Sequence, residues 1–308
     1  MKTTLIRTLL LFFLLVSCAN TPSNPFVSQQ NSAFASQREI RIPTAPDKLD
    51  FAGEPVPLKH FDVAEALTRE LTLNYYWHSN MLYIVRLANR FFPVIEPILQ
   101  REGIPDDFKY LCVAESGLQQ VISPAKAVGF WQFLETTGKE YGLEINSEID
   151  ERYHIEKSTV AACAYLKKAY EKHGSWAMAA AAYNMGNANT NRQIDRQKQT
   201  SYYDLLLPEE TSRYVFRILA FKIIMSNLEN YGFHIREDEL FAPLLWTEVK
   251  VTGTVDSWAD FAEEHGTNYK LLKYFNPWLR GVTLTNKAKK TYVVKVPTPE
   301  FRTKSADL

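Results

Sequence analysis

Glu115 is the residue whose type and surroundings most clearly predict chemistry. Pro105 is typical of the first turn of a helix, and Gly117 is typical of the position just after a helix end. Glu115 therefore falls in the last turn, where the negative pole of the helix dipole and apolar neighbours such as Val113 and Leu118 disfavour an ionised carboxylate. We expect a carboxylic acid that stays protonated near neutral pH, which is the form that a general acid needs.

A second group of polar side chains follows at the end of another predicted helix. Residues 175–184 are rich in alanine, which allows a neighbouring helix to approach closely, and Gly186 provides the C-terminal stop. Tyr183 and Asn184 therefore also lie at a helix end, and a turn at Gly129 lies between the two helix ends in sequence. This arrangement predicts a cleft lined by polar groups on a helical body.

Hydrophobic spacing predicts a mainly α-helical chain with a small mixed C-terminal region. Apolar residues recur with a helical period from Asp62 to about residue 230, with interruptions at Pro93 and Pro97. Further on, residues 246–252 and 291–296 alternate as strands, and helical spacing occupies the positions between them. The expected fold is an all-helical domain followed by a small α+β domain with the order strand, helix, helix, strand.

Several ordered motifs resemble the lysozyme-like domain of lytic transglycosylases, and most closely the membrane-bound murein transglycosylase D group. The resemblance covers roughly residues 75 to 225, and the order of its motifs makes it far more specific than a lone Glu-Ser pair. The motifs that carry it are Glu115-Ser116, Gly129-Phe130-Trp131-Gln132, Asp150-Glu151-Arg152, Tyr183-Asn184-Met185-Gly186 and Leu207-Pro208-Glu209-Glu210-Thr211 with Tyr214.

The resemblance implies a peptidoglycan lytic transglycosylase that cleaves the β-1,4 bond between MurNAc and GlcNAc and leaves 1,6-anhydroMurNAc ends. Glu115 would first protonate the glycosidic oxygen and then act as base while the muramyl 6-hydroxyl attacks the anomeric carbon. Most glycosidases need two carboxylates. The other nearby acidic residues fall at positions where we expect exposure: Glu135, Glu140, Glu144 and Asp150.

Three of the residues that the resemblance implies for substrate binding lie close to Glu115 in sequence. Ser116 and Ser123 would support the loop beside the acid, and Gln132 would contact the glycan.

The other three implied binding residues lie further along the chain. Tyr183 would lie near the acid, Asn184 would hydrogen-bond a substrate amide, and Glu210 would line the same cleft. Tyr183 also fits a core aromatic residue, and Glu210 also fits a helix cap, so Glu115 ranks above them all.

Two other functions fit the same residues. A hydrolytic relative of goose-type lysozyme shares the single glutamate, and a non-catalytic peptidoglycan-binding lipoprotein would use the same surface only to hold glycan.

Residues 233–308 resemble a LysM module, a small fold that holds N-acetylglucosamine chains. Val255-Asp256-Ser257 stands where that family more often has Asp-Thr-Leu. A module that only packs on the catalytic domain is therefore the alternative to a glycan-binding one.

The N-terminus has the features of a secretory lipoprotein. Lys2 and Arg7 precede an apolar run too short to span a bilayer, which predicts a signal peptide over residues 1–17. Cys18 follows Leu-Val-Ser, which resembles a lipobox and predicts a lipidated residue. The polar stretch to residue 57 predicts a flexible tether, and the helical domain is expected over residues 58–232. We expect a lipid-anchored protein of the cell envelope, at the outer membrane and facing the periplasm.

Composition limits the other function classes. The chain has 35 basic and 35 acidic residues with no basic run, so nucleic acid is not an expected partner. Cys112 and Cys163 have apolar neighbours, which favours buried thiols, although a disulfide between them stays possible. No histidine spacing accompanies these cysteines, so we expect neither a metal site nor a cofactor. We expect a monomer whose partners are glycan strands and the membrane.

Overall fold

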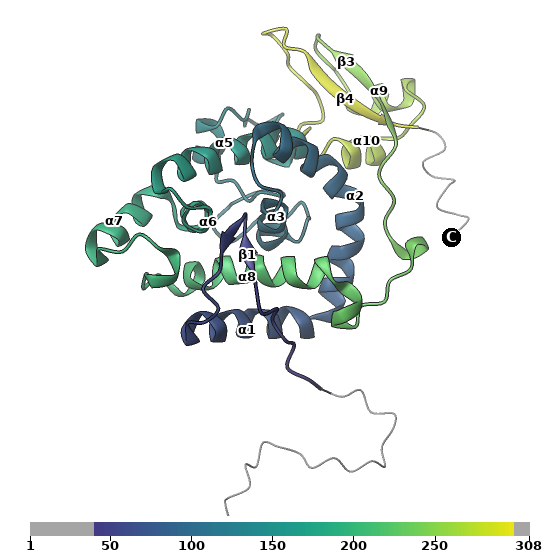
Figure 1. The fold of residues 1–308 in the computed structure, drawn as a ribbon. Coiled ribbons are helices and arrows are strands. Elements are labelled where there is room, and N and C mark those ends of the chain that lie inside the picture. The colour runs from purple at the N-terminus through teal and green to yellow at the C-terminus, as the bar shows by residue number, and fades with distance from the viewer. Residues whose placement is uncertain (1–39, 299–308) are drawn as a thin grey trace, which may run out of the picture. The chain divides into compact units, whose positions relative to one another are not determined.

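The computed structural model describes residues 40–298 of the chain (Figure 1). Its helices are α1 (Phe61–Tyr76), α2 (His78–Glu102), α3 (Phe108–Ser116), α4 (Glu135–Glu140), α5 (Ile155–His173), α6 (Trp176–Met185), α7 (Asn187–Gln197), α8 (Glu209–Ser226), α9 (Trp258–Glu264) and α10 (Tyr269–Phe275). Short 3-10 helices are η1 (Glu151–Tyr153), η2 (Tyr202–Asp204), η3 (Leu228–Tyr231) and η4 (Glu237–Glu239), and the strands are β1 (Asp50–Phe51), β2 (Glu54–Pro55), β3 (Trp246–Val251) and β4 (Tyr292–Pro297). This mainly helical architecture confirms the predicted fold class. The predicted signal peptide and Cys18 lie outside the described residues.

Helix α3, which carries Glu115, is held by helices on several sides (Figure 1). It packs against α2 and α8, and α8 also packs against α1 and α6. Phe108, Leu111 and Cys112 of α3 are fully buried, so the helix contributes a whole apolar face to the main core. Burial of this face fixes where the C-terminal end of α3, and therefore Glu115, lies.

A short hairpin, β1 and β2, precedes the helices and belongs to the folded core. Phe51 is fully buried and its ring lies 5.3 Å from that of Phe108. The Glu54 carboxylate accepts hydrogen bonds from the Trp176 amide (2.7 Å) and the Ser175 hydroxyl (2.9 Å) at the start of α6. The expectation of a tether up to residue 57 is therefore wrong for residues 50–57. One buried aromatic residue in a polar stretch leaves no periodic signal in the sequence.

Helix α2 runs without a break through Pro93 and Pro97, so the predicted interruptions are wrong. Each proline removes one hydrogen-bond donor from the helix. The apolar face between and beyond them, including Ile95 and Leu99, is nevertheless fully buried, and α2 packs against α3 and α5. Tertiary packing outweighs the local preference of proline here.

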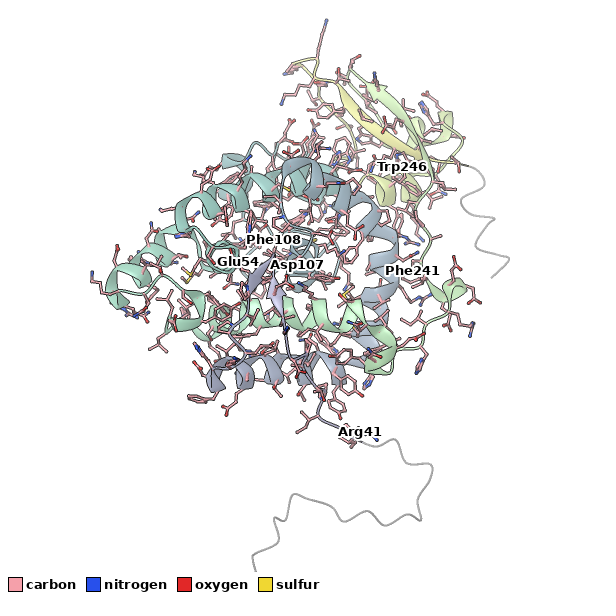
Figure 2. All side chains as sticks on the ribbon, in the orientation of Figure 1. Arg41, Glu54, Asp107, Phe108, Phe241 and Trp246 are labelled. Carbon is pink, nitrogen blue, oxygen red and sulfur yellow. The ribbon has the colours of Figure 1, made fainter. Side chains whose placement is uncertain are left out.

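The segment between α8 and β3 lies along α2. The Arg86 guanidinium donates to the Glu239 carbonyl (2.6 Å), and Arg90 donates to the Ala242 carbonyl (2.9 Å). Phe241 lies in this segment (Figure 2). The guanidinium carbon of Arg86 lies 3.9 Å from the centre of its ring. These contacts attach the segment to the helical domain over several residues.

The C-terminal module has the predicted order of strand, two helices and strand. β3 and β4 are six-residue antiparallel strands, and α9 and α10 lie between them in the chain. Trp258, Leu272 and Val294 are fully buried in a second hydrophobic cluster, which also includes Val128, Ile149 and Tyr153 of the helical domain. This confirms the predicted small α+β domain.

The segment between α4 and α5 holds this module against the helical domain. The Tyr292 hydroxyl donates to the Glu144 carboxylate (3.0 Å), and the Thr285 amide donates to Glu148 (2.8 Å). The Lys295 ammonium pairs with Glu156. Polar contacts therefore add to the apolar packing of Ile149 and Tyr153 in holding the module to the helical domain.

Two remaining features concern the thiols and the membrane. Cys112 and Cys163 are both buried free thiols, which confirms the favoured interpretation and leaves no disulfide between them. Within residues 40–298, no helix is both long enough and apolar enough to cross a membrane.

Candidate active site

Glu115 lies in the last turn of α3, as the sequence predicted. Gly117 ends the helix in the left-handed conformation (φ 59°), and its amide donates to the Val113 carbonyl (2.8 Å). The Ser116 hydroxyl donates to the carbonyl of Phe130 (2.8 Å). This bond ties the end of α3 to the turn that follows Gly129.

The Glu115 side chain is partly exposed, yet surrounding atoms remove most water from its carboxyl group. This burial raises its pKa to about 7. The hydroxyl of Tyr214, in α8, donates a short hydrogen bond to the carboxylate and opposes that rise, as does the charge of Arg217, while Glu210 adds to it. Close to neutral pH the group is therefore divided between acid and carboxylate, as a residue that gives up and takes back a proton requires.

A cleft of about 640 Å³ opens beside Glu115. Its walls come from α1, α2, the end of α3, residues 117–121 and α8. Among its lining residues, Glu70 is buried and receives a hydrogen bond from the Arg213 guanidinium (2.6 Å), with Arg217 3.7 Å away. Glu70 is thus a carboxylate of the cleft whose charge is already matched by two arginines.

The turn at Gly129 is built around buried aromatic residues. Trp131 is fully buried and its indole N–H donates to the Thr159 hydroxyl (2.8 Å). The Tyr183 hydroxyl donates to the Trp131 carbonyl (2.7 Å). The Gln132 amide donates to the carbonyl of Gly129 (2.7 Å) and therefore fastens the turn from within.

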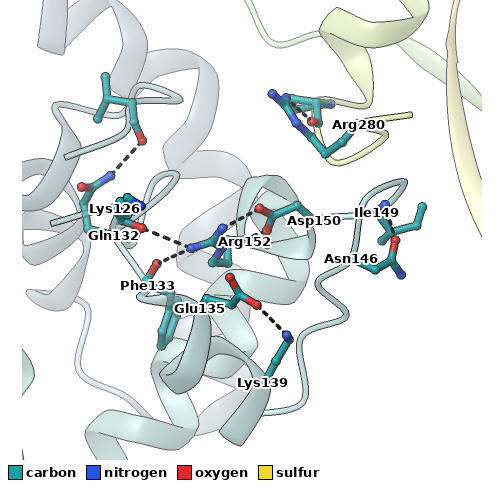
Figure 3. A network of polar contacts seen from close by, with 12 residues as sticks. Lys126, Gln132, Phe133, Glu135, Lys139, Asn146, Ile149, Asp150, Arg152 and Arg280 are labelled. Atoms are coloured by element: carbon teal, nitrogen blue, oxygen red, sulfur yellow. Dashed lines mark hydrogen bonds and ion pairs between the residues drawn. The ribbon is translucent and has the colours of Figure 1, made fainter. Parts of the chain in front are cut away.

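Arg152 holds the same turn from the other side (Figure 3). Its guanidinium donates to the carbonyls of Lys126 and Phe133 (both 3.3 Å) and forms a bidentate pair with Asp150 (2.9 and 2.7 Å). Asp150 is only 7% exposed, so the expectation of an exposed position is wrong. The pair satisfies the buried charges of both residues and uses the arginine to fix the backbone of the turn.

Of the predicted residues, Glu115 and Ser116 line the cleft. Asn184 accepts a hydrogen bond from Thr211 (2.7 Å), and the Ser123 hydroxyl accepts from the Ala127 amide (3.0 Å) within its own loop. Glu210 is exposed and pairs with Arg217 (3.1 Å). The structure thus brings Gln132 and Tyr183 together on the Gly129 turn, and it places Ser123, Asn184 and Glu210 in separate contacts.

Tyr214, Arg217 and Glu70 are the site residues that sequence reasoning missed. Tyr214 is part of a motif, but its motif carries no sign that its hydroxyl reaches a residue 99 positions earlier. Within residues 40–298, no cluster of His, Cys, Asp and Glu side chains is arranged to hold a metal ion.

Comparison with known families defines the class of each domain. Residues 93–206 match the transglycosylase SLT domain, and residues 247–300 match the soluble lytic transglycosylase C-terminal LysM-like domain. The chain therefore carries an SLT domain followed by a LysM-like domain, and the resemblance seen in the motifs is confirmed.

Individual relatives agree with this assignment. The chain is 30% identical over 223 residues to the membrane-bound lytic murein transglycosylase D of Escherichia coli K12. It is equally similar to the protein of that name from Escherichia coli O6:H1. Each match covers 70% of this chain and 49% of the relative, so the chain spans about half the length of the curated relatives it matches.

Proposed function

We propose that this protein is a peptidoglycan lytic transglycosylase with Glu115 as its general acid and base. The observation that carries the proposal is one carboxyl group with a pKa of about 7 at the edge of a cleft of about 640 Å³ in an SLT domain. The relatives named as lytic murein transglycosylases support the same reaction class.

In the proposed reaction, the Glu115 carboxylic acid gives its proton to the glycosidic oxygen as the bond from that oxygen to the anomeric carbon of MurNAc breaks. The substrate's own N-acetyl group stabilises the cationic carbon. The Glu115 carboxylate then takes the proton of the muramyl 6-hydroxyl, whose oxygen bonds to the anomeric carbon. The proton balance closes without water, and a 1,6-anhydro end results.

This reaction needs no second ionised carboxylate. Glu70 also lines the cleft, but Arg213 and Arg217 hold it as the partner of an ion pair, which makes it a poor nucleophile or base. This pairing supports a mechanism with a single carboxylate, which the transglycosylase and the goose-type hydrolytic alternative share, so the reaction products must distinguish the two.

For the other predicted site residues we propose supporting roles. Ser116 and Ser123 hold the loops beside the acid, and Gln132 and Tyr183 shape the Gly129 turn against which the glycan lies. Thr211 orients Asn184 so that its amide can donate to a substrate acetamido group. Glu210 contributes negative charge near the acid, which helps to keep it protonated.

We propose domain boundaries and a cellular setting that agree with the sequence. The helical domain ends near residue 232, the LysM-like domain follows, and the protein acts as a monomer on glycan strands. The signal peptide over residues 1–17, lipidated Cys18 and the polar stretch after it would hold the enzyme at the outer membrane, facing the periplasm.

Digestion of purified sacculi with the whole protein tests the reaction. Mass spectrometry of the muropeptides should show 1,6-anhydromuramyl ends with the wild type and with Glu140→Gln, which changes an exposed carboxylate on α4. Glu115→Gln should give none. Reducing ends without anhydro ends would establish hydrolysis instead, and intact sacculi with the wild type would establish a binding protein.

A further inference from the structure

A second cavity of about 620 Å³ lies between the SLT domain and the LysM-like domain. Both domains supply aromatic residues to its walls, and the segment that joins them supplies Pro243 and Leu244. These aromatic residues include Tyr83, Phe130, Tyr153, Trp246, Tyr274 and Trp278. Glu115 is not among the lining residues, so this cavity is distinct from the cleft of the candidate active site.

The charged groups of this cavity are already paired with one another or with the backbone. The Lys295 ammonium pairs with Glu156, and the His154 ring nitrogen lies 3.1 Å from the same carboxylate. Arg90 donates to the Ala242 carbonyl (2.9 Å) and to the Tyr274 hydroxyl (3.0 Å). The cavity therefore offers little free charge, which favours an uncharged ligand over a phosphate or a charged peptide.

Two of the aromatic residues present much of their surface to solvent. Tyr83 is 42% exposed and Tyr274 is 52% exposed, whereas Trp246 is partly exposed and its ring lies under the Lys295 ammonium, 4.2 Å from the ring centre. Flat aromatic faces with polar edges suit the faces of pyranose rings, which combine C–H bonds with peripheral hydroxyl groups. The chemistry of the cavity thus fits an uncharged pyranose unit, such as the GlcNAc units of a glycan strand.

The second cavity adjoins the cleft of Glu115. Gln119 and Val121 line both. The Gln119 side chain therefore lies where its amide can contact a ligand that passes from one cavity to the other. A polymer bound at Glu115 can therefore continue into the aromatic cavity without leaving the protein surface.

We propose that the cavity between the two domains is an additional saccharide-binding site, which holds the continuation of the glycan strand that occupies the Glu115 cleft. This inference rests on the proposed function for the identity of the polymer. It gives the LysM-like domain a role in substrate binding through α10 and β3, at the face turned toward the SLT domain. It also makes glycan length a determinant of affinity, because a short oligosaccharide fills only the cleft.

Binding measurements with the full chain in the Glu115→Gln background test the site without cleavage. The ligands are peptide-free glycan strands and a tetrasaccharide, each titrated by calorimetry. Tyr274→Ala should weaken binding of long strands by roughly 3- to 10-fold and leave the tetrasaccharide unchanged. Tyr274→Phe, which keeps the ring, should bind nearly as the parent does. The matched control is Tyr269→Ala, because Tyr269 also lies on α10 and is 39% exposed but lines neither cavity.

Three results would overturn the inference. The first is binding of long strands by Tyr274→Ala as tight as that of the parent, and the second is an equal loss for the tetrasaccharide. The third is displacement of long strands by free stem peptide, which would assign the cavity to the peptide. The proposed function is tested independently, because the formation of anhydro ends by the wild type does not depend on Tyr274. In the active enzyme, Tyr274→Ala should raise KM for long strands by the same factor and leave kcat unchanged.

Discussion

Opposing influences set the proton affinity of Glu115. Burial stabilises the neutral acid and raises the pKa to about 7, whereas the Tyr214 hydroxyl and the Arg217 charge stabilise the carboxylate. A group that must donate a proton and then accept one works best when its pKa lies near the working pH. Burial at a helix end could be predicted from the residues around Glu115. The contact with Tyr214 could not, because the two residues meet only after α3 and α8 have packed together.

Replacing Tyr214 by phenylalanine tests this balance. Tyr214→Phe removes a hydrogen bond that favours the carboxylate, so the pKa of Glu115 rises. We expect the alkaline fall of kcat/KM to move to higher pH by about one unit. Tyr183→Phe is the control, because that hydroxyl bonds the Trp131 carbonyl, and the midpoint should stay in place. An unmoved midpoint in Tyr214→Phe would show that the hydroxyl does not tune the acid.

The stability of Glu115→Gln should depend on pH in a defined direction. The folded pKa of about 7 exceeds the ordinary value of 4.5, so the folded chain holds the proton more tightly than the unfolded chain. The wild type is therefore stabilised relative to the variant below pH 4.5, and that advantage disappears as pH rises through 7. We expect the inactive glutamine variant to be at least as stable at neutral pH, with a relative gain of roughly 3 kcal/mol between acid and neutral conditions. Thermal unfolding across a pH series measures this. A variant clearly less stable at neutral pH would identify Glu115 as an ionised structural carboxylate.

At the scale of elements, the Gly129 turn is held in place by hydrogen bonds from several neighbouring elements. Ser116 from α3, Tyr183 from α6 and Arg152 from η1 all bond its backbone carbonyls or those beside it. The turn is thus the point at which three helical elements meet. Its shape should be essential because the Ser116 hydroxyl bonds the Phe130 carbonyl, so a shift of the turn would also move the end of α3.

Gly129→Ala should disrupt this turn. Gly129 has a φ of 81°, and a Cβ atom would lie 2.2 Å from the Arg152 carbonyl oxygen. Gly142→Ala is the matched control, because Gly142 has a φ of 84° with nothing within 4 Å of an added Cβ. Both variants carry backbone strain, but only Gly129→Ala carries the clash, and we expect it to lose about 2 kcal/mol more in urea unfolding and to lose activity. Equal losses in the two variants would mean that the turn relaxes freely.

The sequence predicted helix ends better than it predicted exceptions to local preference. Gly117 and Gly186 correctly marked the ends of α3 and α6, because the residue after a helix end is set by local backbone geometry. The continuity of α2 through Pro93 and Pro97 was not predictable, since it depends on packing against α3 and α5. Burial of Asp150 likewise depends on Arg152 being folded against it.

At the scale of the whole molecule, the order of domains was predictable but their contact was not. The strand, helix, helix, strand order of the LysM-like domain follows from hydrophobic periodicity. The contacts of Glu144, Glu148 and Glu156 with that domain join side chains more than 130 positions apart, so no local pattern indicates them. These contacts hold the LysM-like domain beside the second cavity, which adjoins the cleft of Glu115 at Gln119 and Val121.

Cys18→Ala tests the proposed anchor. If Cys18 carries acyl chains, the variant should lose the incorporation of a fatty-acid probe and accumulate as an unprocessed or soluble form, because several chains on one cysteine are needed for stable attachment. Metabolic labelling followed by membrane fractionation measures both effects. Equal labelling of the wild type and the variant would refute lipidation at this position.

The pH dependence of kcat/KM for formation of 1,6-anhydromuramyl ends tests the central claim most directly. The substrate is isolated glycan strands, and Glu115→Gln serves as the blank. Since the reaction begins with a protonated Glu115, the rate should fall with a midpoint at about 7 as pH rises, and the blank should form no anhydro ends. A rate that stays constant or rises through that pH, or anhydro ends formed by Glu115→Gln, would contradict the assignment of Glu115 as the general acid.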